Sequence, residues 1–237
     1  MAMPSLRALE VLDQVSDMPL SGRPSLAGEK LRSEALALVQ EDRLVEAAYS
    51  YRIVELDHPA GTGDELLYVG GTTLPAPKLI PESGRLTALA FAVTTVGSKI
   101  EQRISGLFGE KRPSLALALD ELGNQLLFAA TRYAVDRIHA DVMRRSLTMA
   151  GELHAGDPGL DLDSQGTVLR LAQAEDIGVG LLGDHVMTPL KSGSMVFGVG
   201  IDLPAATWSR CDECSSRARG KCLFASGANA VAAGRRR

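Results

Sequence analysis

Residues Leu86–Thr95 have the sequence LTALAFAVTT, in which threonine is the only polar residue type. An apolar run of this length, with β-branched and aromatic residues and without glycine or proline, is typical of a fully buried strand. We therefore place this segment in the middle of a β-sheet. Such a sheet needs further strands beside it and helices that cover it.

The flanking sequence supplies candidates for these elements. Residue patterns predict strands at 48–56 and 65–71, and two more in IGVGLL and SMVFGVGIDL, which the connection GDHVMTPLKSG separates. Apolar residues at helical spacing predict helices at 5–15, from Ser25 onward, at 98–109, and from 114 to about 150, the last interrupted by Gly123. Because strands and helices do not alternate regularly, we predict an α+β fold with a twisted, largely antiparallel sheet flanked by helices.

Changes in composition along the chain divide it into four predicted segments. An N-terminal arm is followed by the α+β domain, a cysteine-rich segment and a flexible tail of small residues. Their predicted bounds are 1–24, 25–204, 205–223 and 224–237.

Overall composition excludes several classes of protein. The chain has 237 residues, of which 45% are hydrophobic, and a net charge of -4, which argues against a nucleic-acid binder. We expect no membrane partner, because no apolar run is long enough to cross a bilayer. The N-terminus lacks the apolar core of a signal peptide, so we expect a cytoplasmic protein whose cysteines are reduced.

All three cysteines lie in one short stretch, CDECSSRARGKC, with the pattern C-x2-C-x7-C. Thiolates at this spacing suit zinc or an iron–sulfur cluster, and the basic residues between them lower thiol pKa values. Cys211, Cys214 and Cys222 are therefore the predicted metal ligands. The fourth ligand is open among His185, Asp212, Glu213, water, a partner's side chain and a bound cofactor. A redox dithiol and unliganded thiols are the alternatives.

Other motifs carry less information. The segment GVGLLG, Gly178–Gly183, matches the dinucleotide pattern G-x-G-x-x-G, but a helix precedes it and a turn follows, which is the wrong context for binding a pyrophosphate. Isolated carboxylates such as Asp120 and Glu121 are interpreted as a solvated helix face. The four histidines share no metal-binding spacing and are interpreted singly as surface or hydrogen-bonded residues: His58, His139, His154 and His185.

Four stretches together resemble the activation domain of cobalamin-dependent methionine synthase, in the form that occurs as a separate polypeptide. The likeness runs from about Ala48 to about Leu203. In chain order, it is carried by LYVGGTTLPAPKLI, LAFAVTTVGSKIEQRISGLF, LALALDELGNQLLFAATRYAVDRI and IGVGLLGDHVMTPLKSGSMVFGVG. The resemblance implies a C-shaped α+β domain. It also implies a role: the domain docks on a cobalamin-binding module and presents S-adenosylmethionine, so that reduced cobalamin is trapped by methylation.

The chain departs from this family in the loop that holds S-adenosylmethionine. Where the family has Arg-x-x-Pro-Gly-Tyr-Pro, this sequence has ELHAGDP, so Glu152 replaces the arginine and Asp157 the tyrosine, while Gly156 and Pro158 are kept in type. Asn124 stands where the resemblance places an acid on the long helix. An anion in place of a cation repels the ligand's carboxylate. We therefore predict a degraded or rebuilt site with weakened S-adenosylmethionine binding.

The end that faces cobalamin in the family is better preserved. The segment MTPLKSGS keeps the family's small and hydroxyl residues, which let a backbone approach a corrinoid and bond its amide groups. An ordinary connector between strands is the alternative interpretation. The predicted corrinoid-facing residues are His185, Met187, Pro189, Ser192 and Ser194.

These observations favour a reactivation or partner subunit for a corrinoid methyltransferase, such as a split methionine synthase. The partner would be a corrinoid-binding protein that carries cobalamin, and the cysteine centre would supply or relay the electron that reduces cob(II)alamin. Two alternatives stay open: an S-adenosylmethionine-binding methyl donor, and a non-catalytic assembly subunit anchored by zinc. A zinc-knuckle RNA binder is disfavoured, because the cysteine stretch has no aromatic residue for base stacking.

The cysteine hypothesis predicts the metal content of the protein. Protein purified without oxygen is expected to contain either iron with acid-labile sulfide and broad visible absorption, which would indicate a redox centre, or zinc. Metal and sulfide analysis with a visible spectrum provides the measurement. Zinc alone would make the centre structural, and the absence of iron, zinc and any charge-transfer band would refute a metal centre.

Overall fold

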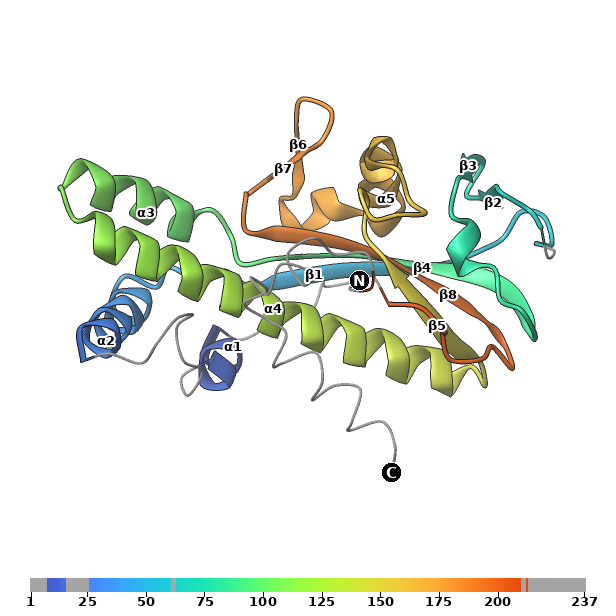
Figure 1. The fold of residues 1–237 in the computed structure, drawn as a ribbon, viewed down its shortest axis with the longest axis horizontal. Coiled ribbons are helices and arrows are strands. Elements are labelled where there is room, and N and C mark those ends of the chain that lie inside the picture. Colours follow the sequence, from blue (N-terminus) through green and yellow to red (C-terminus); the bar gives the residue numbers. More distant parts are fainter. Residues whose placement is uncertain (1–7, 16–25, 61–62, 210–211, 213–237) are drawn as a thin grey trace.

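The computed structural model describes residues 8–15, 26–60, 63–209 and 212, and Figure 1 shows their arrangement. Cys211, Cys214, Cys222 and the predicted tail lie outside the described residues, so the segment boundaries in that region stay predictions. Within the described ranges, no helix combines the length and hydropathy that spanning a membrane requires.

A four-stranded antiparallel sheet forms the centre of the molecule, in the order β1-β4-β8-β5. The predicted central strand is β4, and it pairs with β1 on one side and β8 on the other, which confirms both the α+β class and the place of LTALAFAVTT. The strands are β1 (Ala48–Glu55), β4 (Arg85–Thr95), β5 (Thr148–Leu153) and β8 (Ser192–Ile201).

Strand β4 contributes to a different hydrophobic cluster on each of its faces. Its small side chains lie on one face and its larger ones on the other. Ala88, Ala90 and Ala92 face a cluster that contains Ile138 and Val142 of helix α4 (Pro113–Arg144). Their larger neighbours on the opposite face of the strand, Leu89, Phe91 and Val93, join a cluster with helix α5 (Gln165–Ala172). Figure 1 shows α4 along one side of the sheet, and α5 with two small hairpins on the other.

The amino-terminal half of α4 lies beyond the sheet and organises a helical cluster. Helices α1 (Ala8–Val15), α2 (Leu26–Glu41) and α3 (Lys99–Gly109) pack there. Helix α1 falls in the segment predicted to be an arm, and its apolar residues join this core. Buried members of the cluster include Val11, Val15, Val39, Ile100, Leu107, Leu119 and Leu126.

The long helix was predicted correctly in its position, but its carboxyl-terminal end was predicted too late in the sequence. It was expected to reach about Ala150, but α4 ends at Arg144. Ser146 has a φ of 57°, a left-handed conformation that a helix does not continue through. Thr148–Leu153 then forms β5, because β8 offers an unpaired edge on that side.

The connection before β8 is more structured than the sequence indicated. It contains a two-stranded hairpin of β6 (Gly180–Leu182) and β7 (Val186–Thr188), so GVGLLG leads into a strand and a turn, not a helix. This agrees with the rejection of a dinucleotide site. The remaining elements are the hairpin of β2 (Leu67–Val69) and β3 (Thr72–Leu74), and short 3-10 turns at Pro77–Leu79, Leu162–Ser164 and Ala174–Ile177.

Backbone contact at one glycine of β8 yields a stability prediction. A Cβ atom at Gly200 would lie 2.0 Å from the carbonyl oxygen of Arg85 in β4, whereas one at Gly193 would lie 3.6 Å from its nearest neighbour. Gly200→Ala should therefore reduce the free energy of unfolding by about 2–3 kcal/mol through overpacking. The matched variant Gly193→Ala should change it by less than about 1 kcal/mol. Chemical denaturation measures both, and equal effects would contradict the packing described.

Candidate functional site

The loop after β5 holds the residues predicted to contact S-adenosylmethionine. The backbone N–H of His154 donates to Asp157 Oδ2, and the N–H of Asp157 donates back to the carbonyl of His154, both at 2.9 Å. Asp157 thus closes a tight turn with its own side chain, as aspartate often does in loops. Gly156 has a φ of 92°, which favours glycine, and Pro158 follows.

Glu152 is directed toward a histidine. Its Oε1 lies 2.9 Å from Nε2 of His154, two residues further along the chain. The loop therefore presents an acid–imidazole pair, where the related family presents an arginine. Such a pair accepts hydrogen bonds and attracts cations, and it does not complement a ligand carboxylate.

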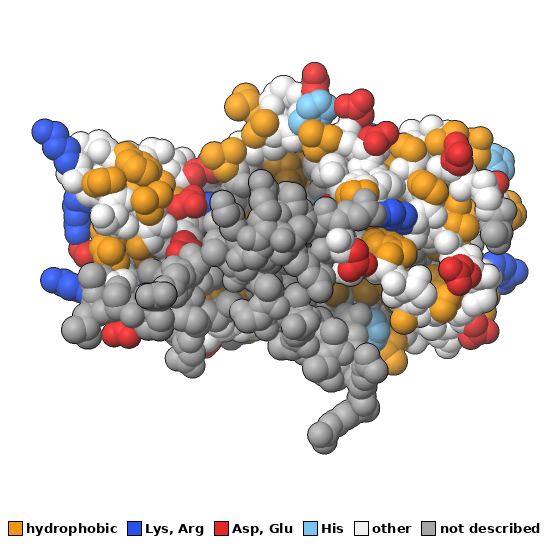
Figure 2. Space-filling model, viewed as in Figure 1, with side chains coloured by type: hydrophobic (Ala, Val, Ile, Leu, Met, Phe, Trp, Pro, Cys, Tyr) orange, Lys and Arg blue, Asp and Glu red, His pale blue; other side chains and the backbone are white. Residues whose placement is uncertain are grey.

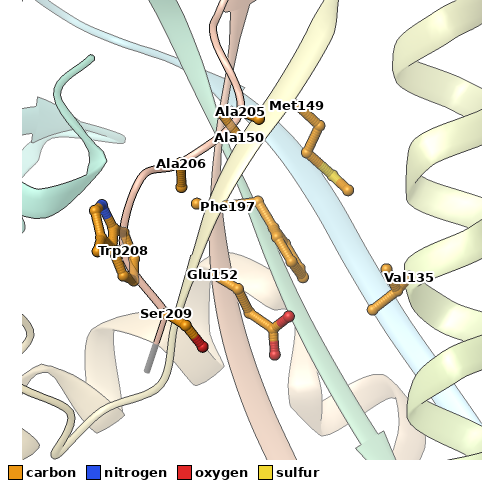
Figure 3. Close-up of a pocket in the computed structure, with 10 residues that line it drawn as sticks. Val135, Met149, Ala150, Glu152, Phe197, Ala205, Ala206, Trp208 and Ser209 are labelled. Carbon is orange, nitrogen blue, oxygen red and sulfur yellow. The ribbon is translucent and has the colours of Figure 1, made fainter. Parts of the chain in front are cut away.

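A cavity of about 310 Å³ lies beside Glu152. Figure 3 shows Phe197 and Glu152 between Val135 of α4 and Trp208, which follows β8. The cavity is lined by Val135, Met149, Ala150, Gly151, Glu152, Phe197, Ala205, Ala206, Trp208 and Ser209. Its volume is at the lower end of the range for small-molecule sites. Polar and apolar atoms contribute about equally to the walls, and Glu152 is the only charged residue among these lining residues.

Asn124 is in a different neighbourhood. It does not line this cavity, and its Oδ1 accepts a hydrogen bond from Nζ of Lys191 at 2.7 Å. The structure therefore places Glu152 in β5 and Gly156, Asp157 and Pro158 in the loop that follows it, while Asn124 belongs to the contact between α4 and the segment before β8.

Lys191 is the residue of this contact that sequence reasoning missed. Its Nζ also bonds Asp120 Oδ1 at 2.7 Å, and its side chain is only 12% exposed. The stem crosses Gly123, where a Cβ atom would approach Cε of Lys191 to 3.3 Å. Gly123, which interrupts the predicted helix pattern, thus marks a position of close packing. Asp120, interpreted as a solvated residue, is an ion-pair partner.

The predicted corrinoid-facing residues divide into buried and exposed groups. Ser192 and Ser194 are buried: the hydroxyl of Ser192 donates to Thr95 Oγ1 at 2.9 Å, and that of Ser194 accepts from Gln165 Nε2 at 3.0 Å. Both hydroxyls are thus used inside the domain. Met187 packs partly against the core. Pro189 follows a cis peptide bond.

The exposed part of this end is apolar with polar residues beside it. His185 lies near the turn of the β6–β7 hairpin, with Nε2 3.5 Å from Asp163 Oδ1. Figure 2 shows hydrophobic, acidic and histidine side chains at the outer end of this hairpin. We call the exposed residues Leu182, Val186 and Leu190 the hairpin patch. A patch of this kind, rimmed by polar residues, is typical of an interaction surface.

The loop that carries Leu190 is held by hydrogen bonds to neighbouring elements. The N–H of Leu190 donates to Glu101 Oε2 of α3 at 2.7 Å, and the carbonyl of Lys191 accepts from the N–H of Val96 at 3.1 Å. Together with the Lys191 ion pair, these bonds hold the loop against α3, α4 and β4. These bonds therefore anchor Leu190, whereas Leu182 and Val186 of the hairpin patch lie on the β6–β7 hairpin itself.

No metal centre is assembled by the residues whose positions are described: no three His, Cys, Asp or Glu side chains are grouped as a metal ion would require. The predicted thiolate ligands lie outside those residues, so their role stays a prediction, as does the participation of His185. The nearest described residue, Asp212, forms a turn with Ser209, whose N–H donates to Asp212 Oδ2 at 2.7 Å.

Comparison with known proteins identifies the fold. No protein-family model and no curated protein matches the chain. Among solved structures, it is similar to the crystal structure of the MetH reactivation domain bound to AdoHcy, with a TM-score of 0.60 and 11% sequence identity. The match covers 94% of this chain and 86% of the other. At this identity the likeness shows a shared fold, and it confirms the resemblance predicted from the sequence.

The Lys191 contact predicts that replacing Lys191 lowers the free energy of unfolding more than replacing the more exposed Lys99. Lys191→Met keeps the apolar stem and removes the charge, so it should reduce the free energy of unfolding by about 1–2 kcal/mol. Lys99 pairs with Glu46 at 2.8 Å but is 47% exposed, so Lys99→Met should cost less than about 0.5 kcal/mol. Urea denaturation compares the two variants. A cost for Lys191→Met no greater than for Lys99→Met would show that the Lys191 contact does not stabilise the loop.

Proposed function

We propose that this chain is a reactivation or partner subunit for a corrinoid methyltransferase, such as a methionine synthase divided into separate polypeptides. It docks on a corrinoid-binding protein that carries cobalamin. There it supports the return of cob(II)alamin to cob(I)alamin, a one-electron reduction. The observation that carries the proposal is the fold shared with the MetH reactivation domain over 94% of the chain.

The hairpin patch supports this function and suggests where docking occurs. Leu182, Val186 and Leu190 are exposed, and they lie in and beside the stretch that resembles the family's corrinoid-facing end. The loop beneath them is fixed by Glu101 and Lys191. A preorganised apolar surface loses little conformational entropy on binding. Because the hydroxyls of Ser192 and Ser194 are used internally, the contact would involve backbone atoms and these exposed side chains.

The cysteine segment gives the proposed subunit a route for the electron. Three thiolates close together hold an iron–sulfur cluster or zinc, and only a cluster changes its oxidation state. Cys211, Cys214 and Cys222 would hold such a cluster, and its chemistry would be the relay of one electron from an external donor to the partner's cob(II)alamin. Zinc would instead favour the assembly role, with the electron coming directly from the outside donor.

Binding of an S-adenosylmethionine-type ligand is a second candidate function, which one observation favours. The MetH reactivation domain of similar fold was crystallised with AdoHcy. In this chain the corresponding loop lies beside the 310 Å³ cavity, but Glu152 and Asp157 replace the residues that the family uses. Glu152 repels a ligand carboxylate and Asp157 bonds its own loop. We therefore expect weaker binding than the family shows.

Docking can be tested by comparing substitutions at two leucines whose side chains are almost equally exposed. Leu190 of the hairpin patch is 64% exposed, and Leu117 of α4 is 63% exposed. Affinity for the cobalamin-loaded corrinoid module of a methionine synthase is measured by calorimetry for Leu190→Asp and Leu117→Asp. Leu190→Asp should weaken binding about tenfold or more, because it places a charge in an apolar contact, whereas Leu117→Asp should bind like the wild type.

Each other outcome has a definite meaning. Equal affinities of the wild type and Leu190→Asp would exclude the hairpin patch as the docking surface. No binding of the wild-type chain to the cobalamin-loaded module would overturn the proposed partner. Binding without any acceleration of cob(II)alamin reduction, followed by the visible spectrum, would leave an assembly role and exclude reactivation.

A further inference from the structure

The two edges of the four-stranded sheet are protected to different extents. Strand β5 forms one edge, where the pairing with β8 shifts register between Ala150 and Leu153 and the indole of Trp208 lies against Gly151. Strand β1 forms the other edge, with eight residues, a continuous register against β4 and neither proline nor glycine. Proteins commonly protect an edge strand with a proline, a bulge or a covering segment. Strand β1 has no proline and no bulge, so its backbone is regular enough to pair with a further strand.

Alternate backbone groups of β1 point away from the sheet. The N–H of Leu56, directly after β1, donates to the carbonyl of Thr87 at 2.9 Å and continues the pairing of β1 with β4. In an antiparallel pair every second residue bonds the partner strand, so the even-numbered residues of β1 bond β4. The N–H and C=O groups of Tyr51, Ile53 and Glu55 therefore point outward. Within the described part of the chain, no hydrogen bond reaches these backbone groups.

Side chains on the two faces of β1 offer different surroundings to an added strand. Tyr51 and Ile53 pack against the cluster that contains Ile138 of α4. Arg52 lies on the opposite face, where it is exposed and its Nη1 donates to Oε1 of Gln173 at 2.9 Å. Side chains of a strand beside β1 would alternate between these faces. Apolar residues suit the first face and acidic residues the second.

Helix α4 adds positive charge beside the same edge. Arg144 pairs with Asp141, whose carboxylate also accepts a hydrogen bond from the hydroxyl of Tyr51. Burial raises the pKa of Tyr49 in β1 and the positive charge of Arg137 opposes this, so Arg137 also lies near the strand. Arg137 and Arg144 are both exposed. The surroundings of this edge are therefore basic, although the net charge of the chain is -4.

We propose that the outer edge of β1 is a docking site for an extended, acidic segment of another protein, which joins the sheet as a fifth strand. The backbone of that segment bonds the outward N–H and C=O groups of β1. Its apolar side chains lie beside Tyr51 and Ile53, and its acidic side chains pair with Arg52. Arg137 and Arg144 strengthen the attraction for a negatively charged segment.

A second copy of this chain fits the edge less well than an acidic segment does. In the antiparallel register that pairs all outward residues from 49 to 55 with one another, Arg52 of one copy would lie directly opposite Arg52 of the other. Like charges at opposed positions destabilise a pair of strands. Two copies of a chain with a net charge of -4 also repel each other. Glu55, at the end of β1, further disfavours an acid at the position opposite it.

A designed peptide tests strand addition to the isolated chain. The probe is a fluorescein-labelled peptide of eight residues in which glutamate alternates with valine, and fluorescence anisotropy measures its affinity. Because the valines face Tyr51 and Ile53, they are the residues that bond the outward groups of β1. N-methylation of the valines should therefore weaken binding about tenfold or more. Lysine in place of glutamate should weaken it by a similar factor, since it meets basic surroundings.

Variants of the protein test the place of docking. Glu55→Pro removes an outward N–H and keeps the bonds to β4, so it should weaken binding of the glutamate peptide about tenfold or more while the domain stays folded. Arg137→Glu should weaken binding about fivefold. Lys111→Glu changes the net charge equally in the exposed turn between α3 and α4, and it should bind within about twofold of the wild type. Thermal unfolding followed by circular dichroism verifies that each variant is folded.

Four results would overturn the proposal. The first is no binding of the glutamate peptide to the wild type. The second is equal affinity for the N-methylated peptide, which would exclude strand addition. The third is an equal effect of Arg137→Glu and Lys111→Glu, which would exclude recognition by the basic residues beside β1. The fourth is a wild-type dimer in sedimentation that Glu55→Pro converts to a monomer, which would assign the edge to a second copy. None of these results bears on docking of the hairpin patch, which is measured separately.

Discussion

The close packing of helix α4 on strand β4 is the constraint on which the rest of the structure depends. Pairs of Cα atoms from the two elements come within 8 Å of each other. This approach requires small side chains on that face of the strand, and Ala88, Ala90 and Ala92 provide them. Larger residues there would move the helix away from the sheet. The position of α4 then determines where α1, α2 and α3 gather, and it places Asp120 and Asn124 beside Lys191.

The central strand, the long helix and the fold class could be predicted because they depend on periodic patterns over many residues. The end of α4 could not, since apolar residues continue at helical spacing past Arg144 and only pairing with β8 shows that Thr148–Leu153 is a strand. Lys191 was missed for a related reason. A single lysine in a loop forms no pattern, and its partners lie 71 and 67 residues away in the chain.

The sequence predicted where the site residues lie in the chain, but it did not predict which partners their side chains bond. Glu152 lies beside a cavity, as a binding residue should, but the sequence did not reveal that Asp157 in the loop after it bonds the backbone of its own loop. The same residue explains how the loop keeps its turn where the family has a tyrosine. Ser192 and Ser194 show the opposite case: a hydroxyl can serve an external ligand or an internal partner, and only the packing around β8 shows the internal use.

The position of the turn at Ser209 and Asp212 limits how far the cysteines can reach. Ser209 lines a cavity with Phe197, which is five residues along β8 from Ser192, or about 17 Å. Cys222 lies ten positions after Asp212 in the sequence, and a chain of that length extends to at most about 35 Å. This upper limit is about twice the distance along β8 from Phe197 to Ser192, so the sequence separation alone permits a span of that length. Shortening the chain between Asp212 and Cys222 would lower this limit by at most about 3.5 Å for each residue removed.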